Sequence, residues 1–477
     1  MSSGDPRGAS HDDAMRAPGD PVGPGSATWG QASIVLMRGA VLALAVALVA
    51  GAIGVLYYIP GVPDRLREAG FAFKTLRPVH TSFVMAWIFL GGVAVVHRYF
   101  EDHSELIDAG GRARLRAQVW LWVLAGVGSL VTIAMGITSG REYLGFHPVF
   151  SIPMLAGWLL FAFTFFKMTG RGFLDRPVYV TMWGVGVLFF VYTFVEQHAW
   201  LLPEVFAHPL TDIRLQWKAT GTLIGSFNLF VYGSLIYVGE RLSGDTRYAH
   251  SRLAYALFAV GVLNSFTNYG HHTYHLPQSH TVKWISFVVS MTEIVILTRV
   301  VWDIAASVGR RAGAGFACTR CLLTATKWWT AAMLGSAIVL SIPPLNTIVH
   351  GTHVVTGHAM GTEIGIDTMA LLAALTWLLE SRRTRSADSQ TTRRDIVTRR
   401  WIIAMNIAAA ALVTWLHVSG TVVGVTRYIG TTPPEWFGSL SVAMFVTAGL
   451  CTGGAMLALL LRWSPELFAP ARALTRP

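Results

Sequence analysis

The sequence predicts an all-α polytopic membrane protein with about twelve transmembrane helices. Of its residues, 53% are hydrophobic and only 13% are charged, whereas soluble chains carry about 25% charged residues. Long apolar runs also follow one another along almost the whole chain. The net charge of +11 does not indicate nucleic-acid binding, because the basic residues lie between the apolar runs and form no single basic face or tail.

The first segment, residues 1–32, is polar and rich in Gly, Pro, Asp and Ser. Such a composition cannot bury a core, so we expect a disordered cytoplasmic tail. The apolar run at 33–59 is longer than a signal-peptide core and should remain as the first membrane helix. The membrane domain is predicted to cover 33–465, with a cytoplasmic C-terminal tail at 466–477.

The helices follow from the length needed to cross about 30 Å of hydrocarbon. The loop after the tenth helix is the most basic segment, so it belongs in the cytoplasm, and counting alternate loops places both termini there as well. Its arginines are Arg382, Arg383, Arg385, Arg393, Arg394, Arg399 and Arg400. The predicted helices cover residues 33–59, 76–97, 115–138, 148–168, 177–197, 215–238, 250–272, 280–306, 323–343, 350–378, 400–427 and 434–462.

Histidines lie inside several of these helices, all towards the outer side of the membrane. They are His80 in helix 2, His271 and His272 in helix 7, and His358 in helix 10. Taken singly, each is better explained as a hydrogen-bonded histidine near the interface. Ionisable side chains within a span are costly, however, and three helices that present imidazoles at one level favour a haem or metal site.

Helix 10 carries a second candidate ligand, Met360. Positions two apart differ by about 200° around a helix, so His358 and Met360 point to nearly opposite sides and one helix can serve two haems. A His80/Met360 pair would raise a haem's reduction potential, although Met360 alone is better explained as packing. Any haem is bound non-covalently, because no histidine follows Cys318 and Cys321 as c-type attachment requires.

Carboxylates also lie within the spans. Glu293 is about halfway along helix 8, where it is expected to relay protons, support a metal, or stay protonated and hydrogen-bonded to a neighbouring helix. Glu363 and Asp367 are one turn apart on helix 10 and could form a second polar track.

Short motifs occur in a definite order after the tail. They are Arg77-Pro78-Val79-His80-Thr81, Gly140-Arg141-Glu142-Tyr143-Leu144, Gly270-His271-His272, Trp284-Ile285, Glu293, His350-Gly351-Thr352 and Gly357-His358. In this order, and with this helix count, the chain resembles the haem-copper oxidase superfamily. It resembles more closely the cytochrome-b-type large subunit of nitric oxide reductase. The resemblance implies a bundle like subunit I of the haem-copper oxidases.

The resemblance implies a role for each matching residue. His80 would ligate a low-spin haem b and His358 a high-spin haem b. His271 and His272 would hold a non-haem metal, either iron or copper. Glu293 would be the active-site carboxylate.

Two further correspondences concern calcium and Met360. Glu142 matches a calcium-binding glutamate of the family. Met360 stands where the family has its second haem-ligating histidine.

The implied reaction joins two nitric oxide molecules, with two electrons and two protons, into nitrous oxide and water. The implied partners are membrane lipid, a small gaseous substrate and a separate electron donor, a membrane-anchored cytochrome c subunit. The implied location is the bacterial cytoplasmic membrane. Two alternatives stay open: a terminal oxidase that reduces dioxygen, and a non-catalytic haem-b electron carrier or gas sensor whose metal site has decayed.

Helix 6 departs from the family pattern. Aligning Trp217-Lys218-Ala219-Thr220-Gly221 puts Gly221 where the family has a third metal-ligating histidine, and Gly225 where the reductases have a glutamate. Two histidines bind a metal less firmly unless another ligand substitutes, such as Asn228, His275 or Glu293.

Overall fold

A computed structural model describes residues 32–103, 109–170, 176–274, 276–383 and 389–469, and every regular element in these ranges is helical. Residues 1–31 and 470–477, which make up most of the predicted tails, lie outside the described ranges, as does His275. The last helix continues through Phe468, slightly beyond the predicted boundary of the membrane domain.

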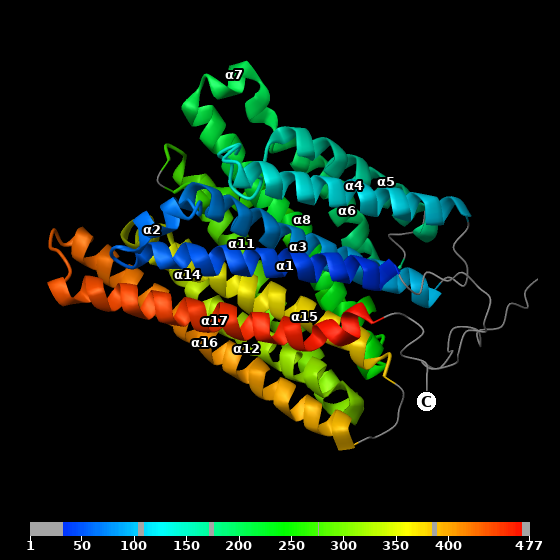
Figure 1. Ribbon diagram of the computed structural model, residues 1–477. Helices are drawn as coiled ribbons and strands as arrows, with labels where there is room; N and C mark the ends of the chain where they lie inside the picture. Colours follow the sequence, from blue (N-terminus) through cyan, green and yellow to red (C-terminus); the bar gives the residue numbers. More distant parts are fainter. Residues whose placement is uncertain (1–31, 104–108, 171–175, 275, 384–388, 470–477) are drawn as a thin grey trace, which may run out of the picture.

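The helices form one bundle in which most axes run roughly alongside one another (Figure 1). Within the described residues, ten helices are long and apolar enough to cross a membrane, or eleven if a bent pair counts as one span. The ten spans are formed by α1 Ala32–Val55, α3 Phe73–His103, α4 Ala109–Ala134, α5 Ser151–Thr169, α6 Val178–Glu196, α8 Pro209–Ser243, α11 His280–Arg311, the helical run from His353 to Glu380, α16 Ser389–Tyr428 and α17 Glu435–Phe468. The bent pair begins with α12 Ala317–Ser341. The predicted all-helical membrane bundle is confirmed.

Two predicted helices are interrupted. The seventh consists of α9, Arg252–Thr267, and a single turn, α10, Tyr269–His272. The tenth consists of α14, His353–Thr362, a π-helical stretch, η8, Glu363–Thr368, and α15, Met369–Glu380. The shorter elements are α2 Val62–Glu68, α7 Pro203–Phe206 and α13 Pro343–Val349.

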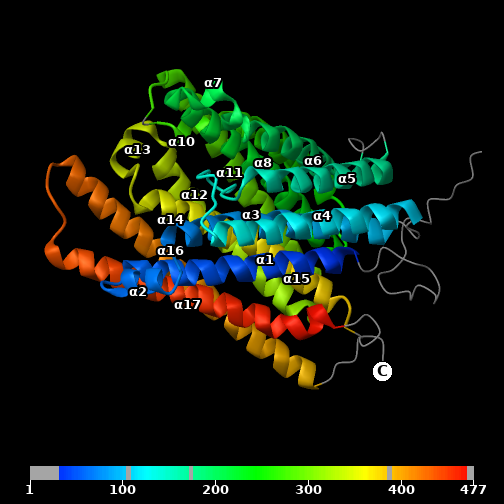
Figure 2. The same ribbon diagram turned by 45° about the horizontal axis from the view of Figure 1, so that its top comes forward.

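The ninth predicted helix ends earlier than expected. α12 stops at Ser341, and α13 turns away from it by 94°. Ile342 between them is extended (φ −69°, ψ 117°) because Pro343 disfavours the helical conformation of the residue before it. As a result, α13 crosses the end of the bundle near α10 and the start of α14 (Figure 2).

This end of the bundle, where α3, α11 and α14 begin and α10 ends, is called the histidine end below. It carries His80, His271, His272 and His358.

Two glycines on α16 let that helix lie directly against the backbone at the histidine end. A Cβ on Gly420 would overlap the backbone of His353 and Val354 at the start of α14. A Cβ on Gly424 would come within 2.5 Å of the Ile348 carbonyl oxygen. Backbone atoms cannot rotate away as a side chain can, so these contacts set the positions of α13 and the start of α14.

We therefore expect Gly420→Ala to destabilise the protein by about 1–3 kcal/mol or more, the usual cost of overpacking a core. The apparent melting temperature of the detergent-solubilised protein measures the effect. Gly454→Ala on α17 is the matched control, because a Cβ there meets nothing within 4 Å. Equal melting temperatures for the two variants would contradict the proposed packing.

Candidate haem and metal site

His80 projects from the first turns of α3 towards α1. Its Nδ1 lies 2.8 Å from the carbonyl oxygen of Ala47, and its ring lies over Gly51, where a Cβ would approach Nδ1 to 2.8 Å. A carbonyl oxygen can only accept, so Nδ1 carries the proton. The lone pair of Nε2 is then available to a metal, and a protein acceptor holds the ring as is typical of metal-bound histidines.

His358 on α14 is held by a chain of polar groups that ends on a carbonyl oxygen. His417 on α16 donates from Nδ1 to the carbonyl of Val413 at 2.8 Å, so its Nε2 is an acceptor. Ser336 on α12 donates to that Nε2 at 2.6 Å, and its oxygen accepts from His358 Nδ1 at 3.2 Å. The chain therefore assigns the proton of His358 to Nδ1 and leaves Nε2 free as a ligand.

Met360 points to different neighbours from His358. It packs against Leu412 and Leu416 on α16 and Ala448 on α17, whereas His358 faces α12 through Ser336. One helix thus presents a nitrogen and a thioether sulfur to two separate parts of the bundle.

The donor set fits haem at both places. An axial haem ligand must offer an unprotonated imidazole nitrogen or a thioether sulfur. His80 and His358 each have Nδ1 engaged with a hydrogen-bond partner, so Nε2 is the nitrogen that remains.

His271 and His272 lie side by side, with their ring centroids 4.3 Å apart. His271 Nδ1 lies 3.1 Å from Ser286 Oγ and 3.2 Å from Ser290 Oγ on α11. Both hydroxyls already donate elsewhere, Ser290 to Asn264 and Ser286 to a backbone carbonyl, so they accept from His271 and its Nε2 is left free. His358 is among the titratable neighbours of His271, so the two imidazoles lie in the same region of the bundle.

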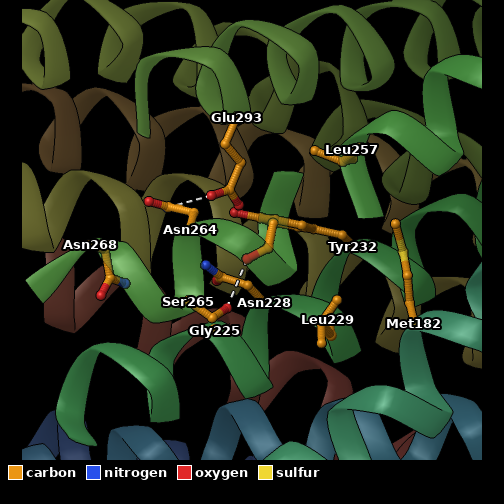
Figure 3. A pocket seen from close by; sticks show the side chains of 11 residues that line it. Met182, Gly225, Asn228, Leu229, Tyr232, Leu257, Asn264, Ser265, Asn268 and Glu293 are labelled. Atoms are coloured by element: carbon orange, nitrogen blue, oxygen red, sulfur yellow. Dashed lines mark hydrogen bonds between the residues drawn. The ribbon is translucent and has the colours of Figure 1, made fainter. Parts of the chain in front are cut away.

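A hydrogen-bonded chain connects His271 with Glu293. Ser290 Oγ donates to Asn264 Oδ1 at 2.7 Å, and Asn264 Nδ2 donates to the Glu293 carboxylate (Figure 3). Glu293 is only 6% exposed, and a buried carboxyl group needs such a partner. Glu293 is therefore linked to His271 through Ser290 and Asn264.

A small cavity adjoins Glu293 between α6, α8, α9 and α11. Its volume of about 10 Å³ is close to the minimum that holds one water molecule. Figure 3 shows Tyr232 reaching across it, with its hydroxyl end towards the Glu293 carboxylate. The cavity can thus hold water for proton exchange but is too small for a porphyrin.

The second polar track lies on the π-helical segment η8. Tyr143 donates to Glu363 at 3.4 Å, while Asp367 is buried and interacts electrostatically with both Glu363 and Tyr232. The Glu363 carboxylate and burial both raise the pKa of Tyr143, so its hydroxyl keeps the proton it donates. Short π-helical segments occur frequently at functional sites.

Glu142, the expected calcium ligand, lies beside the second polar track. Its carboxylate is 2.5 Å from the guanidinium of Arg77 and is 30% exposed. In this structure its partner is therefore an arginine.

The two unexpected glycines on α8 face side chains of the seventh helix. A Cβ on Gly221 would overlap the side-chain amide of Asn268, and a Cβ on Gly225 would overlap the hydroxyl of Ser265. Asn268 also donates from Nδ2 to the Gly221 carbonyl at 3.2 Å. Side chains from the neighbouring helix thus fill the space beside both glycines.

Within the described residues, no third histidine, cysteine or carboxylate joins His271 and His272 in a cluster with donor atoms within 4.8 Å of one another. Such a cluster occurs instead at the far end of α12, formed by Cys318, Glu380 and Asp395. Glu380 accepts there from the backbone N–H groups of Cys318 and Thr319. It therefore caps a helix N-terminus and is explained without a metal.

Several residues of the site were not singled out from the sequence: Asn264, Asn268, Ser290, Ser336 and His417. A signal existed for some of them. Asn264, Asn268 and His271 are spaced three or four apart along the seventh helix, as are Ser286, Ser290 and Glu293 along the eighth, which puts each set on one face. His417 lies within the eleventh predicted span and meets the same criterion as the other histidines.

The chain is similar to known proteins over most of its length. The family model described as cytochrome c and quinol oxidase polypeptide I matches residues 31–456. A solved structure described as the cryo-EM structure of a heme-copper terminal oxidase dimer has a similar fold, with a TM-score of 0.68 and 15% sequence identity over 93% of this chain and 84% of that chain. A search of curated proteins finds no match.

Proposed function

Because the chain belongs to the cytochrome c and quinol oxidase polypeptide I family, a family of haem-binding respiratory oxidoreductases, we propose that it reduces nitric oxide. Two nitric oxide molecules, two electrons and two protons would yield nitrous oxide and water. The observation that carries the proposal is the protonation pattern at the histidine end. Hydrogen bonds there leave Nε2 of His80, His271 and His358 unprotonated and free for metals.

The cofactors are assigned to residues as follows. His80 and Met360 would hold a low-spin haem b, and His358 a high-spin haem b. His271 and His272 would hold a non-haem metal, which we assign as iron. When bound, these groups would supply electron transfer and the binding of the gas.

The protein's own side chains would position the histidine ligands and supply protons. Ser336 and His417 keep the His358 proton on Nδ1, and Ser290 does the same for His271. Glu293 would hold a proton next to the water-sized cavity, where Tyr232 and Asn264 orient its carboxyl group. The amide of Asn264 does not titrate, so this residue orients the hydrogen-bonded groups on either side of it and does not itself transfer a proton.

The sequence of α8, the sixth predicted helix, favours nitric oxide over dioxygen as the substrate. An oxidase of this superfamily normally needs a tyrosine cross-linked to a metal-ligating histidine, but the aligned positions here are Gly221 and Gly225. Tyr232, the next tyrosine along α8, lines the cavity beside Glu293.

The surroundings are proposed on the same basis. The chain would lie in the bacterial cytoplasmic membrane with both termini in the cytoplasm and the histidine end outside. A membrane-anchored cytochrome c subunit would supply electrons. Calcium would bind at Glu142 only if the Arg77 ion pair opens.

Anaerobic turnover of the purified protein with a chemical reductant and mediator tests the proposal. We expect consumption of nitric oxide with formation of half a molecule of nitrous oxide per molecule consumed, and much slower consumption of dioxygen. Protein that binds both haems but turns over no nitric oxide with any donor would refute it. Dioxygen consumption as the faster reaction would favour a terminal oxidase.

The variant Met360→His tests the axial assignment. We expect the low-spin haem to change from a His/Met to a bis-His optical spectrum and its reduction potential to fall, because methionine ligation raises the potential. Met333→Leu on α12 is the control, since that methionine lies beside Gly361, the residue next to Met360, but is assigned to no haem. An unchanged spectrum and potential in the histidine variant would show that Met360 is only a packing residue.

A further inference from the structure

We infer that Asn268 supplies the third protein ligand of the non-haem metal, through its side-chain oxygen. The inference rests on the proposed function, because it concerns the metal assigned to His271 and His272. It replaces the helix 6 histidine, for which Gly221 offers no side chain.

The side-chain amide of Asn268 is hydrogen-bonded through its nitrogen but not through its oxygen. Its Nδ2 donates to the Gly221 carbonyl at 3.2 Å, which fixes the orientation of the amide. Its Oδ1 has no hydrogen-bond partner, although the residue is only 6% exposed. An unpartnered oxygen in such a place is destabilising unless a ligand or a water molecule completes its hydrogen bonding.

Asn268 lies close to both histidines along the helix. Asn268 precedes His271 and His272 by three and four residues, so all three lie on one helical face. Side chains of a helix lean towards its N-terminus, so both imidazoles lean towards the turn that carries Asn268. A metal held by both imidazoles is therefore expected on the Asn268 side.

Asn268 occupies the space beside Gly221. A Cβ built on Gly221 would overlap Asn268 Oδ1. The oxygen therefore stands where a side chain at position 221 of α8 would begin.

The alternatives fit less well. Asn228 and Asn268 both line the cavity beside Glu293, but only Asn268 lies within one helical turn of His271 and His272 along the chain. Glu293 is separated from His271 by Asn264 and Ser290, and His275 lies outside the described residues. Two imidazoles with a neutral amide oxygen form a harder donor set than three imidazoles. This set favours iron(II) over copper(I).

The test measures iron and copper per haem in purified wild type, Asn268→Ala and Asn228→Ala. We expect three irons per two haems in wild type and in Asn228→Ala, but two irons per two haems in Asn268→Ala. After chelation, titration with ferrous iron should give a dissociation constant at least 10–100-fold weaker for Asn268→Ala, since loss of even an outer-shell partner costs that much.

Two further variants keep the test decisive. Asn268→Asp retains an oxygen donor and should hold the third iron even if the alanine variant loses haem. Gly221→His added to Asn268→Ala should restore iron binding, because the amide no longer fills the space.

A third iron retained by Asn268→Ala, or lost from Asn228→Ala alone, would overturn the inference and leave the proposed function standing. Wild type with haem iron but no other metal would overturn both.

Discussion

Replacing His358 with alanine should reduce the haem content of the purified protein from two per chain to one and abolish nitric oxide turnover. His358 is the only residue assigned to the high-spin haem, and its Nε2 is left free by the chain through Ser336 and His417. The remaining haem should keep the optical spectrum of the His80/Met360 pair. Pyridine haemochrome analysis and the reduced-minus-oxidised spectrum measure both effects.

His353→Ala is the matched control for this variant. His353 begins the same helix and contacts Ser419 through Nδ1 at 3.3 Å, but it has no part in the proposed ligation. We expect it to keep both haems. If His358→Ala keeps two haems while His353→Ala loses one, the assignment of the ligand on α14 is wrong.

Replacing Glu293 with glutamine should lower nitric oxide turnover by about 10²–10⁴-fold, the usual contribution of a positioned proton donor. Glutamine is isosteric with the glutamate and can still accept from Asn264, so the packing around the cavity is preserved. Haem content and non-haem iron should therefore stay at the wild-type level. Single-turnover kinetics with the fully reduced protein measures the step directly.

Glu363→Gln distinguishes the two polar tracks. Glu363 accepts a hydrogen bond from Tyr143 and does not line the cavity beside Glu293. If that cavity delivers the proton, replacement of Glu363 should slow turnover much less than Glu293→Gln. The opposite ranking would assign proton delivery to the segment η8.

The helical bundle was predictable because hydropathy alone determines which segments can cross a membrane. The predicted helix at 215–238, for example, is the central part of α8, Pro209–Ser243. The spacing of the histidines likewise indicated one layer of imidazoles. Interruptions were harder to predict, because the π-helical segment Glu363–Thr368 has no local sequence signal and depends on packing, such as that of Gly365 against Trp329.

The side chains that fill the space beside Gly221 and Gly225 could not be predicted from α8. Gly221 and Gly225 show only that side chains are missing there, whereas Asn268 and Ser265, which fill the space, come from another helix. Contacts between helices decide this point, and one sequence does not contain them. His417, in contrast, was detectable as an intramembrane histidine and lacked only a motif around it.

We propose that imidazoles from separate helices meet at one level of the membrane to bind iron porphyrin. Haem content per polypeptide, measured by pyridine haemochrome on wild-type protein produced with an ample haem supply, tests it most directly. We expect two b-type haems per chain. A colourless preparation of folded protein would contradict the claim.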